Sequence, residues 1–149
     1  MCAHKKVLFL LFAIFFGFNV ANAATVKLGT SHLCLDAAIP VAKRLNTPSG
    51  LLQAISLKET GRWDQKRGIS YPWPWTVTAG GKGAYFATKK EAIDKVQALR
   101  QKGVRNIDVG CMQINLFYHP NAFDNLDQAF DPLTNTRYAA IFLTNLYKN

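Results

Sequence analysis

A glutamate at the end of an apolar helix pattern is the residue that points most directly to chemistry. Glu59 is one of two glutamates in the chain, and it shares a helical face with the apolar residues Leu51, Leu52 and Ile55. Partial burial and the negative end of the helix dipole would both favour the protonated carboxyl group. Such an acid is suited to general-acid cleavage of a glycosidic bond. The alternative is a solvated charge at a helix end.

Aromatic and amide residues near Glu59 indicate what such an acid could act on. Sugar rings stack on aromatic side chains through their apolar faces, while their hydroxyl groups bind amides such as Gln113 and Asn115. A groove of this composition would suit a glycan. The alternative is that the aromatic side chains form the core of a small lobe. They are Trp63, Tyr71, Trp73, Trp75, Tyr85 and Phe86.

Two helices are expected in the first part of the fold. Ser31 could cap a helix whose apolar residues recur at helical spacing through 34–45, with Pro40 expected to kink it or delay its start. The next helix, which carries the glutamate, should begin near Pro48, where Thr47 precedes the proline, and end at Gly61.

A small β element should follow. The β-forming runs 75–78 and 84–87 flank the glycine-rich segment 80–83 and predict a hairpin. The partly alternating segment 104–115 predicts a short strand that leads into a turn.

Two later helices have clear start signals. Thr88 and Glu91 form a capping box for a helix that Gly103 ends, and Asp131 and Pro132 begin a final helix. Mostly helical sequence with a small β element predicts an α+β fold in one domain.

The N-terminal residues predict a signal peptide rather than part of the fold. Lys5 and Lys6 precede the apolar run 7–18, and small residues at 21–23 offer a cleavage site after Ala23. Residues 1–23 would then be the signal peptide and 24–149 the single domain, in a periplasmic or secreted protein. An uncleaved anchor is the alternative; after cleavage no membrane span is expected.

Export changes the meaning of the cysteines. Cys2 would leave with the signal peptide, so Cys34 and Cys111 would remain as a pair in an oxidising compartment and are expected to form a disulfide. Two free buried thiols are the alternative. His32 and His119 lack partners at ligand spacing, so we expect no metal and no cofactor.

The charge of the chain points to an anionic polymer. Without the signal peptide it has 16 basic and 9 acidic residues, spread along the sequence, for a formal charge of about +7. Cell-wall glycans or membrane surfaces would attract such a protein, although a solvated basic surface is the alternative. We expect no nucleic-acid partner, because no motif for one is visible.

Several segments together resemble the soluble lytic transglycosylases. The turn at 59–61 after "LLQAISLK" resembles their Glu-Ser-Gly signature, and "NIDVGCMQIN" at 106–115 is similar to their Gly-x-Met-Gln-Ile segment. "YPWPWTV" and "YAAIFLTNLY" resemble the secreted bacterial branch of that family. The matches run in the right order from about Cys34 onward, and the resemblance implies a lysozyme-like fold.

The resemblance also implies a reaction. The family cleaves the β-1,4 bond between N-acetylmuramic acid and N-acetylglucosamine in peptidoglycan. One glutamate, here Glu59, would protonate the leaving oxygen and then take a proton from the muramyl 6-hydroxyl, which gives a 1,6-anhydro sugar. Such a monomeric enzyme would serve wall remodelling or the passage of a secretion or flagellar apparatus. The implied substrate-binding residues are Thr60, Trp75, Tyr85, Met112, Gln113 and Asn115.

The sequence departs from the family in two places and leaves two other functions open. Thr60 replaces the usual serine but keeps the hydroxyl group. The chain stops at Asn149 where family members continue, so either the missing wall of the groove is dispensable here or the chain is a truncated relative with reduced stability or activity. A non-catalytic peptidoglycan-binding or assembly module is one alternative. The other is a muramidase that hydrolyses with Asp64 or Asp108 as its second acid.

Overall fold

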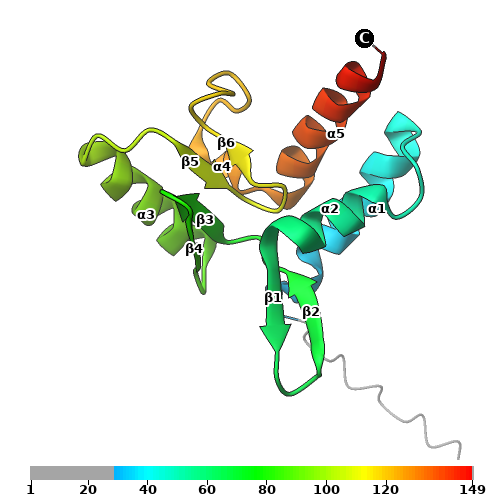
Figure 1. Ribbon diagram of the computed structural model, residues 1–149, viewed down its shortest axis with the longest axis horizontal. Helices are drawn as coiled ribbons and strands as arrows, with labels where there is room; N and C mark the ends of the chain where they lie inside the picture. The colour runs from blue at the N-terminus through cyan, green and yellow to red at the C-terminus, as the bar shows by residue number, and fades with distance from the viewer. Residues whose placement is uncertain (1–28, 149) are drawn as a thin grey trace, which may run out of the picture.

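The computed structural model describes residues 29–148, so the expected signal peptide lies outside the described residues. Within that range the chain has an α+β fold, as predicted, in which helices and two small antiparallel sheets alternate along the sequence (Figure 1). No helix in the described range is both long enough and apolar enough to cross a membrane.

Three helices pack together on one side of the molecule (Figure 1). A short 3-10 turn, η1 (Thr30–His32), leads into α1 (Leu33–Leu45), which packs against α2 (Leu51–Thr60) and α5 (Pro132–Lys148).

The first two helices begin at other residues than the sequence suggested. The N-cap of α1 is His32 rather than Ser31, and α2 follows Gly50, whose φ of 78° is left-handed, rather than Pro48. Pro40 lies inside α1 on its exposed side, where the missing N–H removes one helical hydrogen bond without ending the helix.

The four-stranded sheet contains the predicted hairpin. The strands β3 (Thr76–Ala79) and β4 (Lys82–Tyr85) pair around a two-residue loop, Gly80 and Gly81, whose φ angles of 57° and 72° suit glycine in a type I′ turn. On the other side, β3 pairs with β5 (Ile107–Val109), and β5 pairs with β6 (Ile114–Asn115). The β5–β6 turn, residues 110–113, therefore connects two neighbouring strands.

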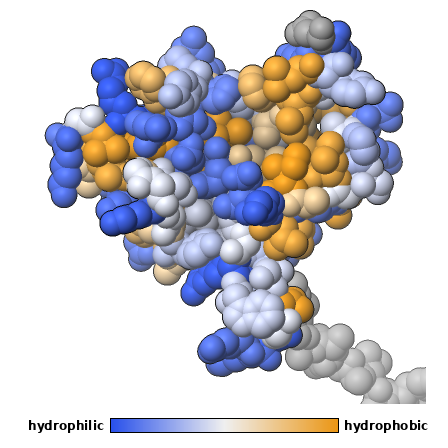
Figure 2. Space-filling model, in the orientation of Figure 1, coloured by the Kyte–Doolittle hydropathy of each residue, from blue (hydrophilic) through white to orange (hydrophobic). Residues whose placement is uncertain are grey.

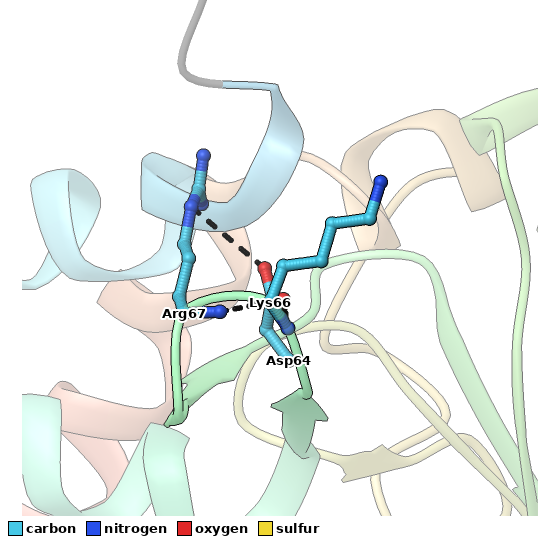
Figure 3. Close-up of polar contacts among 3 residues, drawn as sticks. All are labelled: Asp64, Lys66 and Arg67. Atoms are coloured by element: carbon cyan, nitrogen blue, oxygen red, sulfur yellow. Dashed lines mark hydrogen bonds and ion pairs between the residues drawn. The ribbon is translucent and has the colours of Figure 1, made fainter.

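A second hairpin was not predicted. Its strands β1 (Gly61–Asp64) and β2 (Ile69–Pro72) follow α2 directly and project away from the rest of the fold (Figure 1). Asp64 closes the connecting turn: its Oδ1 accepts the backbone N–H groups of Lys66 at 2.9 Å and Arg67 at 3.2 Å (Figure 3).

The capping signals of the later helices are confirmed. Thr88 Oγ1 accepts the N–H of Glu91 at the start of α3 (Lys89–Gln101), and Glu91 Oε2 accepts the N–H of Ala87. Asp131 Oδ1 accepts the N–H of Thr134 at 2.8 Å and so caps α5. A one-turn helix, α4 (Leu126–Ala129), precedes α5.

Two apolar clusters form the core. The first lies among α1, α2, α5 and the β5–β6 turn, and the second lies between the four-stranded sheet, α3 and α4. Cys34 in α1 and Cys111 in the β5–β6 turn form a disulfide in the first cluster, as the sequence predicted, with a Cα–Cα distance of 5.5 Å. The disulfide fixes α1 to the turn that carries Gln113.

Candidate functional site

Glu59 lies in the last turn of α2, as predicted, but its surroundings differ from the expected ones. The residue is exposed, so the expectation of a partly buried carboxyl group is wrong. The buried stripe of α2 consists of Leu52, Ser56 and Thr60, which are all fully buried. Glu59 lies beside this stripe, on the same face as the half-buried Ile55.

Apolar periodicity did not predict this buried stripe, because two of its three residues are polar. Ser56 and Thr60 are small, so α2 approaches the β5–β6 turn closely: Thr60 Oγ1 lies 2.9 Å from the Ser56 carbonyl oxygen and 3.4 Å from that of Cys111. Thr60 therefore has no exposed surface for a substrate, and the expectation that it contacts one is not met in this structure. It positions the end of α2 instead.

A cavity of about 230 Å³ lies between α2, β6 and α5, and Ile55 forms part of its wall. Apolar side chains gather over α2 and α5 on this face of the molecule (Figure 2). Glu59 lies one helical turn after Ile55 on the same face, but it is not among the residues that line the cavity. The remaining walls are formed by Met112, Gln113, Ile114, Asn115, His119, Ala139, Phe142 and Leu143.

Gln113 holds the β5–β6 turn together with its own side chain. Its Oε1 accepts the hydroxyl of Thr78 at 2.6 Å, and its Nε2 donates to the carbonyl oxygens of Gly110 at 3.0 Å and Thr76 at 3.3 Å. Its φ of 47° is left-handed, a strained backbone for a residue with a side chain. The amide that was expected to bind substrate is thus engaged within the fold, while the residue still lines the cavity.

Asn115 is engaged in the same way. Its Nδ2 donates to Asp108 Oδ1 at 2.7 Å, and its Oδ1 accepts the N–H groups of Phe117 and Tyr118. Met112 is buried and presents one edge to the cavity. Substrate binding by the two amides stays a prediction, and their clearest role in the structure is to shape the wall.

Asn135 is a site residue that sequence reasoning missed. It is fully buried on α5, where its Oδ1 accepts the N–H of Met112 at 2.8 Å and its Nδ2 donates to the carbonyl oxygens of Val109 and Ala129. The available signal was an asparagine one turn before Ala139, on the apolar stripe of the final helix.

His119 and Tyr138 form a second pair that the sequence did not reveal. His119 Nδ1 lies 2.9 Å from the Tyr138 hydroxyl oxygen, and the imidazole meets the ring of Phe142 edge-on, with 4.9 Å between centroids. His119 and Phe142 both line the cavity. The pair adds a polar group to a mostly apolar wall.

Trp75 and Tyr85, the two aromatic residues predicted to contact a substrate, differ in their exposure. Trp75 is buried in the second apolar cluster, which agrees with the alternative that such residues form a core and leaves almost no surface for a ligand. Tyr85 is exposed, and its hydroxyl donates to the Gly61 carbonyl oxygen at 2.9 Å. Its ring therefore lies beside the backbone that directly follows Glu59 and Thr60.

Neither candidate second acid is free of other contacts. Asp64 accepts two backbone N–H groups and lies 3.8 Å from Arg67 Nε (Figure 3). Asp108 accepts a hydrogen bond from the amide of Asn115. No three His, Cys, Asp or Glu side chains gather as a metal site within residues 29–148.

Comparison of this chain with protein-family models, with curated proteins and with solved structures finds no match.

Proposed function

We propose that this chain is a lytic transglycosylase that cleaves the bond between N-acetylmuramic acid and N-acetylglucosamine in peptidoglycan. The observation that carries the proposal is the position of Glu59. Glu59 lies one helical turn after Ile55, which lines the apolar cavity, and its neighbour Thr60 contacts the β5–β6 turn. That turn belongs to the segment that resembles the family's Gly-x-Met-Gln-Ile motif.

The reaction requires one carboxyl group to act twice. Glu59 would first donate a proton to the leaving glycosidic oxygen, and the resulting carboxylate would then accept the proton of the muramyl 6-hydroxyl as that oxygen bonds to the anomeric carbon. Proton donation and acceptance balance, so no water is consumed. The engagement of Asp64 and Asp108 within the fold favours this single-acid reaction over hydrolysis with two carboxylates.

The exposure of Glu59 changes how the reaction would be supported. In the free protein water surrounds the carboxyl group, so a glycan lying over α2 would itself have to displace that water and favour the protonated form. The apolar walls formed by Ile55 and Phe142 offer surfaces on which sugar rings could lie while this occurs.

The same exposure favours a second candidate function, a non-catalytic module that binds peptidoglycan. Such a module needs the cavity but not a protonated Glu59. For either function we propose a periplasmic or secreted protein. The Cys34–Cys111 disulfide supports this location, because oxidising compartments favour disulfides.

Digestion of purified peptidoglycan, followed by mass analysis of the fragments, tests the proposal. We expect 1,6-anhydro ends, lost in Glu59→Gln while binding to the wall persists. Glu91→Gln is the matched control because Glu91 is the only other glutamate and lies at the start of α3. Reducing ends would indicate a muramidase, and binding without cleavage would indicate the non-catalytic module. Undiminished cleavage by Glu59→Gln would refute the role of this acid.

A further inference from the structure

Arg62 is a cation that lies over two aromatic rings. It follows Gly61 on β1, and its Cζ lies 4.7 Å from the centre of the Trp73 ring and 5.8 Å from that of Tyr85. Contacts of this kind attract the guanidinium group through the π electrons of the rings. Such contacts do not require its N–H groups, which remain available for an acceptor.

Both rings under Arg62 are themselves fixed. Trp73 Nε1 donates to the carbonyl oxygen of Phe86 at 2.6 Å, and the Tyr85 hydroxyl donates to that of Gly61 at 2.9 Å. The guanidinium group thus rests on two side chains that are anchored to the backbone. Less side-chain entropy would be lost when such a group binds a ligand than when a freely rotating cation does.

No carboxylate within residues 29–148 forms an ion pair with Arg62. The nearest acid along β1, Asp64, is occupied by the turn backbone and by Arg67 (Figure 3). Arg62 is exposed and lies three residues after Glu59, so their Cα atoms are at most about 11 Å apart. A guanidinium group without an ion pair in the described residues therefore lies within three residues of the candidate acid along the chain.

We infer that Arg62, three residues after Glu59, is a carboxylate-binding residue, and that the chain selects glycans that carry a carboxylate close to the bond being cleaved. The inference rests on the proposed function. The planar fork of arginine donates two parallel hydrogen bonds to a carboxylate, and charge-assisted bonds of this kind are stronger than neutral ones. In peptidoglycan the carboxylate has two sources: the lactyl group of muramic acid where no peptide is attached, and the peptide itself where it forms an amide with that lactyl group.

Calorimetric titration of the protein carrying Glu59→Gln, which removes turnover at an exposed residue, tests the inference with three tetrasaccharide probes. The first consists of N-acetylglucosamine alone and has no carboxylate. The second contains N-acetylmuramic acid without peptide, and the third carries the peptides. Adding Arg62→Gln should weaken binding of a carboxylate-bearing probe about ten- to a hundredfold and leave the first probe unchanged. Loss with the second probe identifies the lactyl carboxylate, and loss with the third probe alone identifies the peptide.

Lys66→Gln is the matched control, because it removes the same charge from the exposed turn of the same hairpin. Arg62→Lys keeps the positive charge but not the planar guanidinium group, so this variant should lose part of the affinity for the carboxylate-bearing probe. It also tests the inference if Arg62→Gln does not fold. Two outcomes would overturn the carboxylate site: an equal loss of affinity in Arg62→Gln and Lys66→Gln, or unchanged affinity in both Arg62 variants. In either case, binding of the glycan probes would still support the proposed function. Failure of the Glu59→Gln protein to bind any probe would overturn both.

Discussion

The side-chain oxygen of Asn135 accepts the backbone N–H of Met112 at 2.8 Å, so a buried amide on α5 fixes the turn that forms one wall of the cavity. The other end of the amide donates to the carbonyl oxygens of Val109 and Ala129. One side chain therefore joins α5, β5 and α4 behind the candidate site.

Replacing Asn135 with alanine should be strongly destabilising. The change leaves an N–H group and two carbonyl oxygens without partners in the interior, and each unpaired buried group costs about 1–3 kcal/mol. We expect the free energy of unfolding in urea to fall by about 3 kcal/mol or more. Asn145→Ala, at an exposed position of the same helix, should change it by less than about 0.5 kcal/mol. Similar values for both variants would show that the buried amide does not fix the turn.

Gly110 should tolerate no side chain, for two separable reasons. Its φ of 78° is left-handed, and a Cβ atom there would lie 2.5 Å from Asn135 Nδ2 and 2.9 Å from the Ala129 carbonyl oxygen. Gly103 has the same φ with no atom within 4 Å, so Gly103→Ala measures the backbone strain alone, about 1 kcal/mol. We expect Gly110→Ala to lower the melting temperature clearly more than Gly103→Ala. Equal shifts would mean that the contact with Asn135 relaxes without cost.

Local signals along the sequence were enough to predict much of the fold. The two-glycine hairpin turn, the capping box at Thr88 and Glu91, and the aspartate cap of α5 each depend on neighbouring residues, so their physics is visible in a short window. The disulfide could be expected because the predicted loss of a signal peptide would leave two cysteines to pair.

The candidate site was harder to predict, because its wall depends on contacts between distant segments. Apolar periodicity placed Glu59 on the buried face of α2, whereas Ser56 and Thr60 occupy that face by virtue of their small size. The inward orientation of Gln113 likewise depends on Thr78, which lies 35 residues earlier in the chain. A sequence window around Gln113 does not contain its partner.

Removing the disulfide should lower stability more than removing any single surface contact. The bond joins residues that are 77 positions apart, and closing a loop of that length in the unfolded chain corresponds to about 4 kcal/mol. We expect the double variant with Cys34→Ala and Cys111→Ala to unfold at a lower urea concentration, by the amount that corresponds to this loss of free energy. Thiol titration of the unreduced wild-type protein should find neither of these two cysteines reactive. Two reactive thiols at these positions would contradict the bond.

Thr60 should tolerate serine but not valine. Serine keeps the hydroxyl donor that lies 2.9 Å from the Ser56 carbonyl oxygen and 3.4 Å from that of Cys111, whereas valine has a similar volume without it. We expect Thr60→Val to lower the free energy of unfolding by about 1–2 kcal/mol and Thr60→Ser to lower it less. The opposite order would show that the methyl group of Thr60, and not its hydroxyl, joins α2 to the β5–β6 turn.

Gln113→Ala should show whether the shape of the cavity wall affects cleavage independently of the overall stability of the fold. The substitution leaves the Thr78 hydroxyl without its acceptor and removes the amide donor from the Gly110 and Thr76 carbonyl oxygens, which keep their backbone donors. A turn released from its left-handed backbone would no longer hold the cavity wall in place. If the chain cleaves peptidoglycan as proposed, the release of anhydro fragments should fall by about ten- to a hundredfold, the effect expected when a site is displaced by about 1 Å.

The matched control for this variant is Gln97→Ala, at an exposed position of α3 far along the chain from the cavity wall. It should leave both cleavage and unfolding unchanged, since surface substitutions away from such contacts shift stability by less than about 0.5 kcal/mol. Full cleavage by Gln113→Ala at a temperature where the protein stays folded would show that the β5–β6 turn does not position the substrate. Because Gln113 does not contact Glu59 in this structure, a loss of cleavage without unfolding would have to arise from the geometry of the wall.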